Sequence, residues 1–110
     1  MRIPHADRAV IEPAKLRDYR LSPTHPVGRF KAAFFLAHGY GAEDWQRLEW
    51  DLRRHVQADA ASRQETRYGR KFEIRAQVVS PTGEVIDLVS VWIVPRGETA
   101  PRFVTAYPGG

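Results

Sequence analysis

The segment from Thr24 to Lys31 holds the side chains of this sequence that are best suited to acid–base chemistry. A proline lies on either side of His25, so we expect a stiff, exposed loop that leads into a helix. Such a loop would bring the imidazole of His25 to the start of that helix, beside Arg29 and Lys31 on its first turn. Amide donors and two cations would then converge on one space, and a phosphodiester fits such a space.

RNA cleavage without a metal needs three kinds of group. A base takes the proton of the 2′-hydroxyl, cations hold the charge that develops at phosphorus, and an acid protonates the leaving 5′-oxygen. His25, Arg29 and Lys31 provide groups of these kinds. The alternative is that His25 only orders the turn and that the two cations are solvated surface charges.

A second candidate is a basic run between residues 63 and 75, with aromatic residues interleaved. Lys71 and Arg75 share the polar face of a predicted strand, with Glu73 between them. One interpretation is a solvated strand face. A second interpretation is an RNA-binding edge, where the cations contact successive phosphates and Tyr68 stacks on a base. A third is a face that binds an acidic antitoxin. The cations of the run are Arg63, Arg67, Arg70, Lys71 and Arg75.

The last predicted strand supplies two hydroxyl groups. Thr105 and Tyr107 are two residues apart and therefore share a face, while strict alternation puts Arg102 on the other face as a neighbouring cation. We expect Thr105 and Tyr107 at the edge of a catalytic pocket, and Arg102 as an RNA-binding residue. The alternative for Tyr107 is a half-buried core position, and Trp92 on the preceding strand is interpreted as core.

Metal and cofactor chemistry find little support in the sequence. There is no cysteine, and the four histidines, His5, His25, His38 and His55, show no metal-ligand spacing. Gly39 and Gly41 follow a predicted helix rather than a strand, so they indicate a turn and not a phosphate-binding loop. We therefore expect no metal and no cofactor, and we assign structural roles to His38 and His55.

The elements that would position these residues follow from periodicity. Helical spacing predicts helices over 13–20, 29–38 and 43–57, with Gly39 as the C-cap of the second. Residues 57–64 read as a surface connection. Alternation then predicts strands over 71–78, 85–94 and 102–107, the second of them central and covered on both faces. Helices followed by strands indicate an α+β fold, with N-terminal helices packed on one face of a three- to four-stranded antiparallel meander sheet.

Length and composition limit the remaining choices. The 110 residues suit a single domain over 1–110, and 43% of them are hydrophobic, enough for one core. No stretch approaches the roughly 20 apolar residues of a membrane span, so we expect a soluble, cytoplasmic protein with no membrane partner. The net charge of +4 favours a polyanionic partner such as RNA.

Three segments of the chain together resemble a small bacterial domain family. That family is found beside a short companion gene and at the tips of polymorphic toxins. The pattern histidine, proline, x, glycine, x, x, lysine from His25 to Lys31 and the threonine, alanine, tyrosine ending at Tyr107 are its most specific features. The segments are 4–10 with 15–21, then 22–35, then 89–94 with 102–108.

This family is similar in turn to the ribonuclease group that includes barnase, the EndoU nucleases, tRNA-cutting colicins and RelE toxins. The resemblance implies RNA cleavage to a 2′,3′-cyclic phosphate. It also implies His25 and Lys31 as the catalytic pair, and Thr105 and Tyr107 as site residues on the sheet. Membership of a fold group does not fix an activity, so this step is an analogy.

Three functions are therefore carried forward. The first is a metal-independent endoribonuclease, the toxin of a toxin–antitoxin pair, with a small antitoxin encoded nearby and a homodimer or toxin–antitoxin hetero-oligomer as its assembly. The second is a non-catalytic binding module, an antitoxin or adaptor, that uses the basic face. The third, transfer chemistry on a nucleotide cofactor, has the least support because the sequence lacks a glycine-rich loop after a strand.

Overall fold

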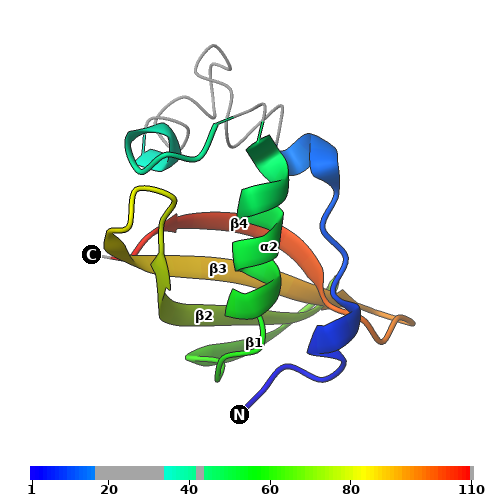
Figure 1. The fold of residues 1–110 in the computed structure, drawn as a ribbon. Helices are drawn as coiled ribbons and strands as arrows, with labels where there is room; N and C mark the ends of the chain where they lie inside the picture. The colour runs from blue at the N-terminus through cyan, green and yellow to red at the C-terminus, as the bar shows by residue number, and fades with distance from the viewer. Residues whose placement is uncertain (17–33, 42–43, 110) are drawn as a thin grey trace.

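The protein is a four-stranded antiparallel sheet with its helices on one face (Figure 1). The computed structural model describes residues 1–16, 34–41 and 44–109. The strands are β1 (Ser62–Thr66), β2 (Gly69–Val79), β3 (Val85–Pro95) and β4 (Arg102–Pro108). They follow one another in the order β1-β2-β3-β4. The predicted α+β class and the antiparallel meander are confirmed.

The first strand was not predicted, and the interpretation of 57–64 as a connection without regular structure is wrong for its last residues. β1 is defined by backbone pairing with β2, from Ser62 opposite Glu73 to Thr66 opposite Gly69. Its side chains are exposed except at Thr66, so no alternation of apolar and polar residues marks it. Gly69 adopts φ 145°, and a Cβ there would lie 2.2 Å from the carbonyl oxygen of Val94.

The two central strands have the two faces that alternation predicts. On β3, Leu88 and Trp92 are buried in the hydrophobic core on the helix side of the sheet. Val89 and Val91 are also buried, although they lie on the opposite, outer face and outside that core cluster. β3 is therefore a central strand that is covered on both faces, as expected from its composition.

Helix α2 (Trp45–His55) is the principal helix over the sheet (Figure 1). Its apolar stripe buries Leu48 and Leu52, and Val56 continues the stripe just beyond the helix end. This helix lies within the predicted span of 43–57. Residues 13–16 and 34–37 are helical and belong to the other two predicted helices, whose remaining parts, 17–20 and 29–33, lie outside the described residues. Gly39 follows with φ 90°, as the predicted cap requires.

The N-terminal segment is part of the core. It contains a short 3₁₀ helix, η1 (Ala6–Arg8), and buries Ile3 and Ile11. Val10 forms two backbone hydrogen bonds with the residues on either side of Arg102, at the start of β4. Its N–H donates to the carbonyl of Pro101, and its carbonyl accepts from the N–H of Phe103. No helix in the described part of the chain is long and apolar enough to cross a membrane.

Candidate functional site

The predicted site residues fall in two groups. His25, Arg29 and Lys31 lie outside the described residues, so their positions stay a prediction. Thr105 and Tyr107 lie on β4, where they pair with Val91 and Val89 of β3. Both face the outer side of the sheet, away from α2, and both are half-buried. The prediction that these two hydroxyl groups share a face is confirmed.

A β-bulge changes the expected position of Arg102. The register between β3 and β4 shifts at Val91 and Trp92, so Phe103 pairs with Trp92 while Thr105 pairs with Val91. The bulge adds Val104 to β4, so that Arg102, opposite Ile93, lies on the outer face with Thr105. The expectation that Arg102 lies on the other face is therefore wrong, because strict alternation does not hold across a bulge.

Two further cations lie on this outer face, which we call the basic face and define by Lys71, Arg75, Arg102, Thr105 and Tyr107. Ile93 lies between Lys71 on one side and Arg102 on the other, and Val89 lies between Arg75 and Tyr107 in the same way. Arg75 contacts Glu73 at 2.8 Å and Arg102 contacts Glu98 at 2.9 Å. Lys71 is exposed and forms no ion pair within the described part of the chain.

Arg70 does not belong to the basic face. It pairs with Val94 and points to the opposite side of the sheet from Lys71. There it lines a hollow of about 380 Å³ beside the start of β2 and the end of β3. The charged residues that line this hollow are Glu65, Arg70, Arg96 and Glu98. Cations and carboxylates are balanced in that hollow, so it has no strong preference for an anion.

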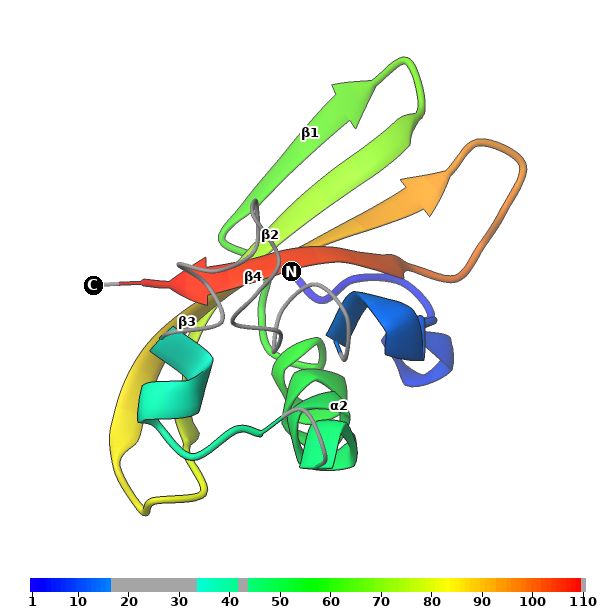
Figure 2. The same cartoon turned by 90° about the horizontal axis from the view of Figure 1, so that it is seen from above.

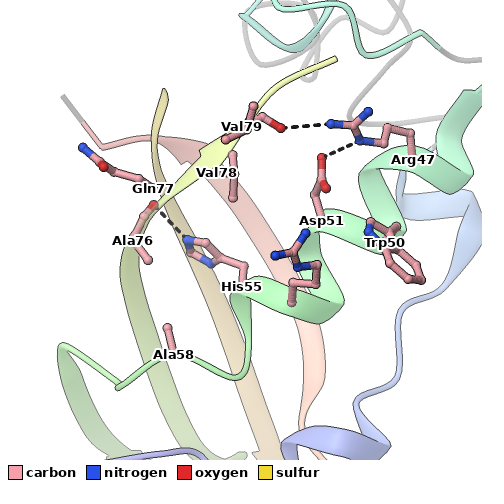
Figure 3. A pocket seen from close by; sticks show the side chains of 10 residues that line it. Arg47, Trp50, Asp51, His55, Ala58, Ala76, Gln77, Val78 and Val79 are labelled. Atoms are coloured by element: carbon pink, nitrogen blue, oxygen red, sulfur yellow. Dashed lines mark hydrogen bonds and ion pairs between the residues drawn. The ribbon is translucent and has the colours of Figure 1, made fainter. Parts of the chain in front are cut away.

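A larger pocket, of about 440 Å³, lies between α2 and β2 (Figure 3). Sequence reasoning did not anticipate it, because its walls come from a helix and a strand more than 20 residues apart. It is lined by Arg47, Trp50, Asp51, Arg54, His55, Ala58 and the strand segment 76–79.

The wall of the pocket includes the buried carboxylate of Asp51, which accepts hydrogen bonds from two side chains. Asp51 accepts a hydrogen bond of 2.6 Å from the Tyr40 hydroxyl and one of 3.0 Å from Arg47 Nε. Arg47 also donates to the carbonyl of Val79 at 2.9 Å, which ties α2 to β2. Burial, reinforced by the bond to Asp51, raises the pKa of Tyr40, so the phenol stays protonated. These hydrogen bonds, both to Oδ2 of Asp51, stabilise the fold.

His55 forms the floor of the pocket and is built into the core. Its Nδ1 lies 2.6 Å from the Ser90 hydroxyl, and its Nε2 lies 3.1 Å from the carbonyl oxygens of Ala76 and Leu88. Carbonyls only accept, so Nε2 carries the proton and Nδ1 accepts from Ser90, whose oxygen accepts from Trp92 Nε1 at 2.8 Å. Every polar atom of the ring is bonded, which agrees with a structural role.

The structural role assigned to His38 stays a prediction, because its buried Nδ1 has no hydrogen-bond partner within the described residues. Its ring lies 4.9 Å from that of Phe34, and its Nδ1 lies 3.7 Å from a carboxylate oxygen of Glu84. The described residues contain no group of three or more histidine or carboxylate side chains that would hold a metal ion.

The burial of His55 predicts a pH-dependent stability. Burial lowers the pKa of His55 in the folded protein, whereas in the unfolded chain it returns to about 6.5. The unfolded state then binds the proton more readily, so the contribution to stability is complete above about pH 6.5 and is lost as the pH falls below it. Urea unfolding at a series of pH values should show this fall, and His55→Gln should flatten it. An equally steep fall in the variant would contradict this origin.

Comparison with known proteins places the fold. A solved structure described as a contact-dependent growth inhibition toxin–immunity protein complex from Klebsiella pneumoniae 342 contains a similar chain. The TM-score is 0.72 at 15% identity, and the match covers 96% of this chain and 97% of that one. No curated protein matches the chain. The profile of a family described as "Domain of unknown function (DUF6883)" matches residues 2–110, and the chain therefore belongs to this family.

Proposed function

We propose that this chain is an endoribonuclease toxin of a bacterial toxin–antitoxin pair and that it cleaves RNA in the cytoplasm without a metal. The observation that carries the proposal is the basic face, where a β-bulge brings Arg102 to the same side of the sheet as Thr105 and Tyr107. The net charge of +4 and the likeness to a chain of a toxin–immunity protein complex support it.

In the proposed reaction the 2′-oxygen of a ribose attacks the adjacent phosphorus. A bond forms between them, the bond from phosphorus to the 5′-oxygen breaks, and the products are a 2′,3′-cyclic phosphate and a 5′-hydroxyl. A base removes the 2′-proton and an acid protonates the leaving 5′-oxygen. The sequence motif assigns this proton transfer to His25 and Lys31, with Arg29 holding the phosphate.

The basic face would stabilise the charge that develops on the phosphorus oxygens. Hydroxyl donors on Thr105 and Tyr107 and the guanidinium of Arg102 suit the non-bridging oxygens of a pentavalent phosphorus. Lys71 and Arg75 both lie on β2, two strands away from β4, which corresponds to a Cα separation of about 10 Å. At that separation they would hold neighbouring phosphates of the same RNA strand.

The test is the degradation of total RNA by purified protein in the presence of EDTA. We expect cleavage that leaves cyclic phosphate ends, and we expect Arg102→Gln to slow it by about tenfold because one cation beside the phosphate is lost. Arg8→Gln is the matched control, since Arg8 is exposed outside the basic face and should leave the rate unchanged. Intact RNA after incubation with folded protein would exclude this function.

A second candidate follows from the same likeness, because the similar complex contains an immunity protein as well as a toxin. In that case the chain is a non-catalytic antitoxin or adaptor, and its basic face binds an acidic partner. A stable complex with the product of the neighbouring gene, together with no RNA degradation in EDTA, would identify this role.

A further inference from the structure

One edge of the sheet loses its neighbour halfway along β2. β1 pairs with β2 only from Gly69 to Glu73, whereas β2 continues to Val79 beside β3 (Figure 2). Among the described residues no strand pairs with the remaining part of that edge, 75–79. Open edges of this kind are templates for the addition of another strand.

The direction of the backbone groups along this edge can be worked out. The Glu73 carbonyl accepts from Ala61 and the Val79 carbonyl accepts from Arg47, both from the side away from β3. In an antiparallel ladder every second residue points its N–H and C=O to the same side. The N–H and C=O groups of Arg75 and Gln77 therefore point to the open edge as well, and no partner for them lies within the described residues.

Helix α2 forms a wall beside this edge, so the edge opens into the larger pocket (Figure 3). Trp50 is 62% exposed although it is an aromatic residue on a helix that packs against the sheet. Arg54, one turn further along, is exposed and forms no ion pair in the described part of the chain. By contrast, β1 has exposed side chains, and the hollow that its Glu65 lines has balanced charges.

We propose that an extended, acidic segment of a partner protein adds as a strand to the 75–79 edge of β2 and fills this pocket. Side chains two apart on such a strand lie about 6.8 Å from each other on one face. Trp50 and Arg54 are four apart on a helix, so their Cβ atoms are about 6 Å apart. An apolar and an acidic side chain at alternate positions would thus meet Trp50 and Arg54 together.

The chemistry of the pocket favours a peptide over RNA. A row of alternating donors and acceptors matches a polypeptide backbone, whereas the phosphates of RNA only accept. In the pocket wall Asp51 is paired with Arg47, so Arg54 supplies the uncompensated positive charge that an acidic side chain needs. The inference does not rest on the proposed RNA cleavage, because it uses none of the residues of the basic face.

The experiment titrates the full chain with a capped synthetic peptide, Thr-Glu-Thr-Val-Thr-Glu, which places a glutamate two residues from valine in both directions. We expect perturbation of the Trp50 indole in NMR spectra and slower amide exchange at Arg75, Gln77 and Val79. The amides of Ala76 and Val78 already face β3 and should not change. This alternation in protection is specific to strand addition.

Variants of the chain that are expected to fold normally test which residues bind the peptide. Gln77→Pro removes one edge donor, which an edge strand tolerates, and should abolish binding. Arg54→Glu should weaken the peptide by about tenfold through charge reversal, while Arg8→Glu, an exposed control elsewhere, should not.

Three results would overturn the proposal. The first is equal binding of a peptide with lysine in place of glutamate, and the second is indole perturbation without amide protection. The third is perturbation of Trp50 by a uridine oligonucleotide while the acidic peptide has no effect. Each of these readouts is separate from RNA cleavage, so the failure of this proposal is distinguishable from the failure of the proposed function.

Discussion

Replacing His55 with alanine is expected to lower the free energy of unfolding by about 3 kcal/mol. The imidazole is 3% exposed and bonds to a helix-facing serine and to two strand carbonyls. Its removal leaves a cavity beneath α2 and takes the acceptor from the Ser90 hydroxyl. The Ser90 hydroxyl also accepts a hydrogen bond from the indole of Trp92, so the loss of its bond to His55 would weaken the constraint on that indole. Trp92 is the largest fully buried side chain in the described core. The loss thus combines cavity formation with an unsatisfied buried hydroxyl.

Denaturant unfolding of the wild-type and variant proteins measures this loss. Gln57→Ala is the matched control, because Gln57 is exposed just beyond the end of the same helix and should change stability by less than about 0.5 kcal/mol. A cost for His55→Ala as small as that of the control would show that the ring is not part of the cooperative core.

The fold could be predicted wherever the sequence has a burial pattern. On β2 and β3 the alternation of apolar residues fixed the strand faces, because one side of the sheet packs against α2. β1 has no such pattern, since its side chains are solvent-exposed and its position depends on backbone bonds to β2 alone. Backbone pairing leaves no trace in side-chain type, which is why this strand was missed.

The site was predictable only in part, for a related reason. The shared face of Thr105 and Tyr107 followed from alternation, and the structural role of His55 followed from its place on the apolar stripe. The bulge at Val104 was not predictable, since nothing in the local sequence requires an extra residue there. The bonds between Tyr40, Asp51 and Arg47 were also missed, because Asp51 looks like any acid on the polar face of a helix.

These observations divide the two faces of the sheet by role. On the helix side His55 bonds to Ser90 and to two strand carbonyls, and Asp51 accepts from Tyr40 and Arg47, so these polar groups are committed to stability. On the outer side Lys71 forms no ion pair within the described residues, and the ion pairs of Arg75 and Arg102 are exposed. Exposed pairs contribute little to stability and exchange readily for a phosphate. The outer face is therefore the side of the sheet that the proposed ribonuclease would use to bind RNA.

The sharpest test of the proposed chemistry is His25→Ala, which we expect to reduce RNA cleavage by about 10²- to 10⁴-fold. His25 lies outside the described residues, and the expectation comes from its place in the histidine, proline, x, glycine, x, x, lysine motif. In the proposed mechanism, loss of the only imidazole in that motif would remove a proton acceptor for the 2′-hydroxyl, while the cations of the basic face would still be available to bind RNA. Cleavage should therefore be lost without a comparable loss of affinity.

The matched control for this variant is His5→Asn. His5 is exposed and adopts φ 57°, a conformation that asparagine tolerates, so the substitution should affect neither folding nor cleavage. Circular dichroism and unfolding curves should be the same for both variants and the wild type. Wild-type rates in a folded His25→Ala protein would remove the imidazole from the mechanism, and the proton transfer would then have to come from another group near the basic face, such as Lys31 or the Tyr107 phenol.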